Sequence, residues 1–168
     1  FRRVLFRSTK FAGEMLAEKK AYVAEIVLGV RTSTADREGE IISQSDVAAD
    51  DEKVVQTVHS FIGELEQTPP MYSALKMSGV PLYRYARQGI DVPRASRRVT
   101  IYKIEVMRIQ HPVVEFSVTC SKGTYVRSLA EDIGAALGCG AYLPKLIRTE
   151  IGPFALRSEE HTSELQSH

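Results

Sequence analysis

The sequence contains no apolar run that approaches the roughly 18 residues needed to cross a bilayer, which excludes a transmembrane protein. Two cysteines are too few for a disulfide scaffold, and four histidines in no ligand spacing do not indicate zinc. The first eight residues carry three arginines but no apolar core of a secretion signal. We therefore expect a reduced, cytoplasmic setting, no metal, and buried, unpaired thiols at Cys120 and Cys139.

The sequence also lacks an excess of charge of one sign. It has 22 lysines and arginines against 21 aspartates and glutamates, and 43% of its 168 residues are hydrophobic. A disordered chain would need lower hydrophobicity and a larger net charge. The composition is typical of one soluble globular domain.

The two ends of the chain are related through their coding DNA. If residues 1–8 are encoded by TTC CGA CGT GTG CTC TTC CGA TCT, the reverse complement encodes Arg-Ser-Glu-Glu-His-Thr-Ser-Glu, which is residues 157–164 in order. Both strings look like translated sequencing-adapter DNA. We therefore expect residues 1–8 and 157–168 to be non-native tails, and residues 9–156 to be part of a longer protein.

The pattern of apolar residues predicts an α+β fold. Strands are expected over residues 21–28, 99–107, 113–120 and 146–151, and the second and third of these should pair antiparallel. Helices are expected over residues 51–65, capped by Asp50 or Asp51, and from residue 126 to a stop at Gly138 and Gly140. Residues 31–40 are predicted to form a loop, and Pro69 and Pro70 exclude a helix where they stand. A mixed, mostly antiparallel sheet flanked by helices is favoured over a doubly wound parallel sheet.

Positive charge is concentrated in residues 70–98, which carry a net charge of +5, whereas residues 9–156 as a whole sum to zero. Tyr72, Tyr83 and Tyr85 lie among the basic residues. Arginines beside exposed aromatic rings suit an RNA-binding insertion, whereas the alternative is an ordinary solvated surface with the tyrosines packed inward; composition alone leaves both open. The basic residues are Lys76, Arg84, Arg87, Arg94, Arg97 and Arg98.

Five motifs carry a resemblance to a known family. They are Lys-Ala-Tyr at 20–22, Gln-Thr-Pro-Pro-Met-Tyr-Ser-Ala-Leu-Lys at 67–76, Leu-Tyr-Arg-Tyr-Ala-Arg-Gln-Gly-Ile at 82–90, Cys-Ser-Lys-Gly-Thr-Tyr-Val-Arg at 120–127, and Gly-Cys-Gly-Ala at 138–141. In this order, and over nearly all of residues 9–156, the chain resembles the TruB family of tRNA pseudouridine synthases.

The resemblance implies a fold and an activity. It implies the pseudouridine synthase fold, truncated here at its N-terminus, and isomerisation of the T-loop uridine at tRNA position 55 through a flipped-out base. It implies no cofactor, a tRNA T stem-loop as partner, and a monomer. The family's nucleophilic aspartate stands in a Gly-x-Leu-Asp-Pro motif expected upstream of Thr9, so we expect this fragment to be inactive and to leave an unpaired sheet edge.

The resemblance also implies roles for individual residues. Arg127 matches the arginine that pairs with the catalytic aspartate, and Tyr22 matches the tyrosine that stacks on the flipped base and could move a proton. Tyr125 and Leu146 match residues of the uracil pocket, and Lys76 matches a lysine near the site. Asp36 matches an acidic residue of a polar loop near the site, with no reason to make it the nucleophile. Residues 70–98 correspond to a thumb-like insertion that holds RNA through Arg84, Arg87, Arg94, Arg97 and Arg98.

Two other functions fit the same motifs. A non-catalytic RNA-binding module would use the same thumb and pocket without chemistry, and the gene sequence upstream of residue 9 distinguishes it from an enzyme. A guide-RNA-dependent pseudouridine synthase would share the motifs but act inside a multi-protein particle. The well-matched thumb favours an enzyme that acts alone on tRNA.

Overall fold

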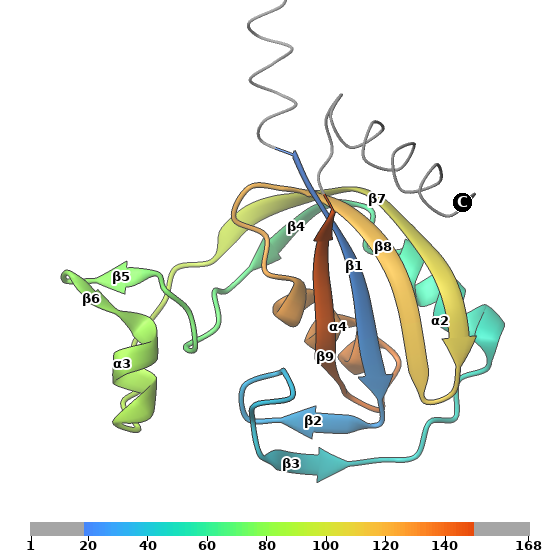
Figure 1. Ribbon diagram of the computed structural model, residues 1–168, viewed down its shortest axis with the longest axis horizontal. Helices are drawn as coiled ribbons and strands as arrows, with labels where there is room; N and C mark the ends of the chain where they lie inside the picture. The colour runs from blue at the N-terminus through green and yellow to red at the C-terminus, as the bar shows by residue number, and fades with distance from the viewer. Residues whose placement is uncertain (1–18, 150–168) are drawn as a thin grey trace, which may run out of the picture.

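A five-stranded antiparallel sheet forms the centre of the computed structural model, which describes residues 19–149 (Figure 1). The strand order is β4-β7-β8-β1-β9. The bounds are β1 Lys19–Leu28, β4 Gly63–Gln67, β7 Arg97–Gln110, β8 Val113–Ser121 and β9 Ala141–Thr149. The expected tails, residues 1–8 and 157–168, lie outside the described residues.

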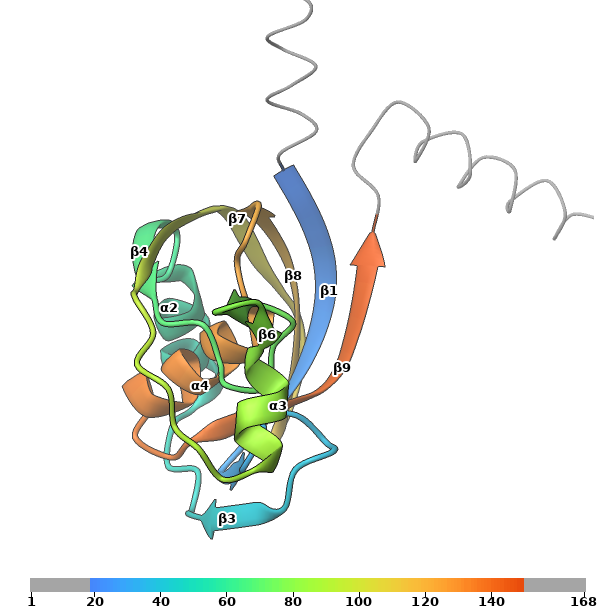
Figure 2. The same cartoon turned by 90° about the vertical axis from the view of Figure 1, so that its left-hand side faces the viewer.

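Two helices, α2 (Asp51–His59) and α4 (Val126–Ala136), cover the same face of the sheet (Figure 2). Alternate residues of each strand face them, because successive side chains of a strand point to opposite faces. Ile26 of β1, Phe116 of β8 and Leu129 of α4 have no exposed surface, and they lie at the centre of the core. Within residues 19–149 no helix is long and apolar enough to cross a membrane.

Two smaller units project from this centre. β2 (Val30–Thr32) and β3 (Ile41–Gln44) form a hairpin beside the lower end of β1 and β9 (Figure 1). The predicted insertion, residues 70–98, contains β5 (Lys76–Met77), β6 (Val80–Pro81) and α3 (Leu82–Arg87). It extends away from the sheet to the left in Figure 1, and we call residues 70–98 the thumb.

Most predicted elements are confirmed, including the strand over 21–28, the antiparallel pair β7–β8 and the helix that follows residue 125. Asp50 caps α2, with its side chain accepting a hydrogen bond from the Lys53 N–H. Cys120 and Cys139 are buried free thiols, as expected.

The helix predicted over residues 51–65 is wrong in its last part. It ends at His59, and residues 63–67 form β4. Gly63 has a φ of +122°, which an α-helix cannot include, so the chain turns there. Leu65 suited both patterns, because one apolar residue fits the helical and the strand period equally well.

Two boundaries also differ from the prediction. β9 begins at Ala141, five residues before the predicted start. The strand can include Pro144 because β9 lies at the edge of the sheet, where the missing proline N–H breaks no hydrogen bond between strands. The predicted loop over 31–40 is shorter, since Arg31 and Thr32 belong to β2. The last two residues of the predicted strand, 150 and 151, lie outside the described residues.

α4 lies unusually close to β9 at Gly134. A Cβ atom placed on Gly134 would lie 2.3 Å from the backbone nitrogen of Ala141, which is closer than real Cβ atoms come. The hydrogen atom of glycine therefore sets the distance between the helix and the edge strand.

Replacing Phe116 by alanine tests the core. The side chain is fully buried, so Phe116→Ala should lower the free energy of unfolding by about 3–5 kcal/mol. The matched control is Met107→Ala on the adjacent strand, where the side chain is 56% exposed and the change should stay within about 0.5 kcal/mol. Urea unfolding followed by circular dichroism measures both, and equal effects would contradict this core.

Candidate active site

The turn between β2 and β3 holds the carboxylate of Asp36. Thr34 Oγ1 donates a hydrogen bond of 2.5 Å to Asp36 Oδ1, and the Glu38 N–H donates to the same oxygen at 2.9 Å. Thr32 Oγ1 donates to the Asp36 carbonyl at 2.6 Å. Three short bonds within one turn therefore fix both the backbone and the side chain of Asp36.

The residue before Asp36 adopts a rare backbone conformation. Ala35 has a φ of +61° and is buried, and a non-glycine residue in this region costs roughly 1–2 kcal/mol. Its carbonyl accepts a hydrogen bond of 2.8 Å from the Leu143 N–H, so β9 holds the turn in place. Backbone strain of this kind, retained beside a fixed carboxylate, is typical of functional sites.

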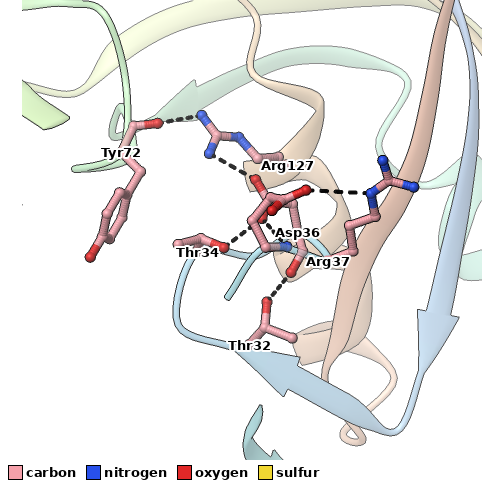
Figure 3. Close-up of polar contacts among 7 residues, drawn as sticks. Thr32, Thr34, Asp36, Arg37, Tyr72 and Arg127 are labelled. Carbon is pink, nitrogen blue, oxygen red and sulfur yellow. Dashed lines mark hydrogen bonds and ion pairs between the residues drawn. The ribbon is translucent and has the colours of Figure 1, made fainter. Parts of the chain in front are cut away.

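The second member of the site is Arg127, in the first turn of α4. Its Nη1 lies 3.3 Å from Asp36 Oδ2, and its Nη2 donates to the carbonyl of Tyr72 at the base of the thumb (Figure 3). The side chains of Arg127 and Asp36 are 22% and 25% exposed, so solvent screens this ion pair only in part. The positive end of the α4 dipole adds to the potential that favours an anion there.

A cavity of about 290 Å³ lies next to this ion pair. The Asp36 turn (residues 33–35), the start of the thumb (residues 68–72) and α4 contribute its walls, together with Arg94. Ser128 and Glu131 are the α4 residues that line it. The cavity therefore lies where the sheet domain, the thumb and the head of α4 meet.

Glu131 is a half-buried carboxyl in the wall of this cavity. Burial raises the pKa of Glu131 above its ordinary value, and the charge of Asp132 raises it further, while Arg31 and Arg127 lower it. The protonated form is therefore favoured more strongly in the folded chain than in the unfolded chain.

Two of the predicted base-binding residues, Tyr22 and Leu146, lie on the sheet face that carries the helices. Tyr22 of β1 is half-buried and packs against the core, and burial raises the pKa of its hydroxyl. It pairs in register with Val118, three residues before β8 ends, and the turn that follows leads to Tyr125 and Arg127. Leu146 is opposite Ala24 on β9 and is 42% exposed.

The structure thus brings Asp36, Arg127 and Tyr72 into direct contact, with Tyr125 two residues from Arg127. Tyr22 and Leu146 share a sheet face, but neither they nor Tyr125 line the cavity of 290 Å³. Lys76 is exposed in β5 on the thumb and has no contact with Arg127 among the described interactions. The resemblance placed Asp36 in a polar loop near the site, but the sequence analysis did not predict that Asp36 pairs with Arg127.

The thumb arginines are not equivalent. Arg84, Arg87, Arg97 and Arg98 are exposed, and Arg87 lies over the ring of Tyr83 with its guanidinium carbon 5.4 Å from the ring centre. The Arg94 side chain is only 22% exposed, and it lies 3.7 Å from Asp91. Its buried Nε has no hydrogen-bond partner among residues 19–149. Arg94 therefore belongs to the cavity wall rather than to the open surface of the thumb.

No group of three or more histidine, cysteine, aspartate or glutamate side chains within residues 19–149 is arranged to hold a metal ion.

Two family models match this chain. The family model for the N-terminal domain of TruB family pseudouridylate synthase matches residues 4–126, and the model for the C-terminal domain of tRNA pseudouridylate synthase B matches residues 127–167. The chain belongs to the TruB family.

Curated relatives support this membership. A tRNA pseudouridine synthase B of Burkholderia mallei (strain NCTC 10247) is 52% identical over 149 residues, and one of Idiomarina loihiensis is 48% identical over 151 residues. These matches cover 89% and 90% of this chain but 49% of each relative. The chain therefore spans about half the length of the curated relatives it matches.

Solved structures show the same fold. A chain in a Cbf5-Nop10-Gar1 complex has a TM-score of 0.56 at 34% identity, over 81% of this chain and 31% of that one. A chain in an H/ACA RNP bound to a substrate RNA containing 2'-deoxyuridine has a TM-score of 0.53 at 28% identity, over 84% of this chain and 31% of that one. The predicted α+β fold of the pseudouridine synthases is confirmed.

The raised pKa of Glu131 predicts a dependence of stability on pH. A carboxyl whose pKa is higher in the folded state adds stability below its unfolded pKa, about 4.3, and this contribution is lost as pH rises through the folded value. Glu131→Gln should therefore reduce the fall in Tm between pH 4 and pH 7. Thermal unfolding at several pH values measures this, with the exposed Glu64→Gln as control. A fall of unchanged size in Glu131→Gln would contradict the prediction.

Proposed function

We propose that the longer protein to which residues 9–156 belong isomerises uridine to pseudouridine in the T loop of tRNA, at position 55. The observation that carries this proposal is the Arg127 guanidinium, held at the head of α4 between the Asp36 carboxylate and the Tyr72 carbonyl. Family membership and relatives named tRNA pseudouridine synthase B support the same reaction. The protein is proposed to act as a cytoplasmic monomer without a cofactor.

This chain supplies residues for base binding, for orienting the nucleophile and for proton transfer. The uridine leaves its loop and its base stacks on Tyr22, with Tyr125 and Leu146 completing the pocket. Arg127 keeps the nucleophilic aspartate ionised and oriented, and Asp36 holds Arg127 in turn. The Tyr22 hydroxyl, whose pKa burial raises, stays protonated at neutral pH and can donate a proton during the reaction.

The nucleophilic aspartate is proposed to lie outside this chain. The printed sequence contains no Gly-x-Leu-Asp-Pro motif. The pairing of Arg127 with Asp36 is compatible with a second carboxylate, because a guanidinium has five N–H donors and can bind two carboxylates at once. Asp36 is then the constant partner of Arg127, and the missing aspartate is the reactive one.

The thumb is proposed to hold the T stem-loop. Four exposed arginines give it a surface that attracts phosphates, and residues 70–98 carry a net charge of +5. Lys76 at its outer strand adds to this surface rather than to the base pocket.

An RNA-binding module without catalysis is the second candidate for the chain as printed, and the thumb favours it. A guide-RNA-dependent enzyme is the third, since the similar solved structures include an H/ACA RNP. The higher identity to relatives named tRNA pseudouridine synthase B, 52% against 28–34%, favours an enzyme that acts alone on tRNA.

A chimera tests the proposed reaction. In it, residues 19–149 replace the matching segment of the Burkholderia mallei relative, which supplies the remaining half of the protein. We expect the chimera to form pseudouridine in an unmodified tRNA transcript without guide RNA, and the 168-residue chain to form none. A transcript with cytidine at position 55 should give no product. Turnover by the chain alone, or none by the chimera, would overturn the proposal.

Arg127→Lys in the chimera tests the role of the guanidinium. Lysine keeps the charge but loses the fork that reaches Asp36 and Tyr72 together, so kcat should fall by about 10²- to 10³-fold. The control is Arg37→Lys, an exposed arginine of the same turn, which should leave kcat unchanged. Steady-state assays measure kcat and single-turnover assays measure the chemical step separately from product release. An Arg127→Lys enzyme with unchanged rates would contradict the assignment.

Neutralising the thumb tests RNA binding separately from chemistry. A triple variant, Arg84→Gln, Arg87→Gln and Arg97→Gln, should bind a T-arm stem-loop more weakly. The slope of log affinity against log salt concentration should fall by up to about 0.9 for each phosphate contact removed. The control neutralises three exposed basic residues outside the thumb, Lys53, Lys103 and Arg108, and should keep the slope. Equal slopes in the two triple variants would exclude the thumb as the RNA-binding surface.

A further inference from the structure

The side chain of Gln67 makes two hydrogen bonds to the backbone of one residue, Tyr125, which lies 58 positions away in the sequence. Gln67 Nε2 donates to the Tyr125 carbonyl at 3.2 Å, and Gln67 Oε1 accepts from the Tyr125 N–H at 3.0 Å. The Gln67 residue is 3% exposed. Its amide thus imitates the paired N–H···O bonds that neighbouring antiparallel strands exchange.

Tyr125 is the point at which extended backbone changes to helix. It is the N-cap of α4, with φ −99° and ψ 110°, and its own side chain makes no capping hydrogen bond. Its carbonyl also accepts the first helical bond, from the Leu129 N–H at 3.1 Å. Among residues 19–149, the Tyr125 N–H has its hydrogen bond with Gln67 alone. Gln67 therefore fixes the orientation of the peptide units that lead into the first turn of α4.

Gln67 also lies at the start of the thumb. It is the last residue of β4, and Thr68, Pro69 and Pro70 follow it directly. The segment 67–72 contacts the head of α4 twice, through Gln67 to Tyr125 and through the Tyr72 carbonyl to Arg127. The same segment lines the cavity of 290 Å³ together with Ser128.

We propose that Gln67 is a positioning residue of the pseudouridine synthase reaction. Its buried amide sets the direction of Tyr125, and hence of Arg127 two residues later, and it ties both to the base of the RNA-binding thumb. Gln67 itself touches neither the base nor the nucleophile. This inference rests on the proposed function, because Tyr125 and Arg127 matter for catalysis only if the site binds uridine.

Kinetics of the chimera with Gln67→Met test the proposal. Methionine fills a similar volume but can neither accept from the Tyr125 N–H nor donate to its carbonyl. Because a displacement of about 1 Å can cost a hundredfold in rate, we expect kcat to fall by at least about tenfold. The KM for tRNA should change by less than about threefold, since the exposed thumb arginines still bind the RNA. Gln110→Met, at an exposed glutamine of β7, is the control and should leave both values unchanged.

A pH profile separates positioning from a purely structural role. In Gln67→Glu the ionised carboxylate still accepts from the Tyr125 N–H but repels the Tyr125 carbonyl, whereas the protonated carboxyl can accept and donate as the amide does. Turnover of Gln67→Glu relative to the unmutated chimera should therefore rise as pH is lowered through the pKa of the introduced group. Because protonation of a buried glutamate also restores stability, turnover is compared per folded molecule, with the folded fraction measured at each pH.

Hydrogen exchange in the 168-residue chain tests the contact without catalysis. In Gln67→Met the Tyr125 amide should exchange at least about tenfold faster, while amides in the middle of α4 keep their rates. Gln67→Glu serves as a second variant if Gln67→Met does not fold.

The outcomes are distinguishable. An unmutated chimera without turnover overturns the proposed function, and this inference with it. An active chimera whose Gln67→Met variant keeps its kcat, or loses it only in proportion to its folded fraction, overturns the inference alone. The same holds if the relative turnover of Gln67→Glu does not change with pH.

Discussion

The ion pair between Arg127 and Asp36 joins two separate parts of the fold, the first turn of α4 and the turn between β2 and β3. The β2–β3 turn holds Asp36 through Thr32, Thr34 and the backbone of Glu38. The head of α4 holds Arg127, whose second nitrogen reaches the base of the thumb. A long, polar side chain loses rotamer entropy when it is held in one position, and the contacts of Arg127 with Asp36 and Tyr72 offset that loss.

The base of the thumb is the third part of this arrangement. The Tyr72 carbonyl accepts a hydrogen bond from Arg127. The side chain of Gln67 makes two hydrogen bonds to the backbone of Tyr125. RNA that binds the exposed arginines would therefore act on the same short segment that contacts the proposed catalytic arginine. Residues 67–72 therefore lie between the exposed arginines of the thumb and the head of α4.

The sequence predicted β1, β7 and β8, of which β8 alternates strictly between buried and partly exposed residues. It failed at α2 because Gly63 ends the helical pattern through its backbone and not through its hydrophobicity. The family motifs identified Tyr22, Tyr125 and Arg127 as candidates, but no pattern in the sequence shows that Asp36 and Arg127, 91 positions apart, touch. Contacts of this range depend on the packing of α4 against β9, which local propensity does not encode. The tails and the position of the missing nucleophile stay predictions.

Gly134 acts on the ion pair from a distance. It sits seven residues after Arg127, two turns or about 10 Å along α4, where the helix touches the first residue of β9. β9 in turn carries Leu143, whose N–H holds the carbonyl of Ala35 beside Asp36. The absence of a methyl group at Gly134 thus allows α4, which carries Arg127, to pack directly against β9, which holds the turn of Asp36.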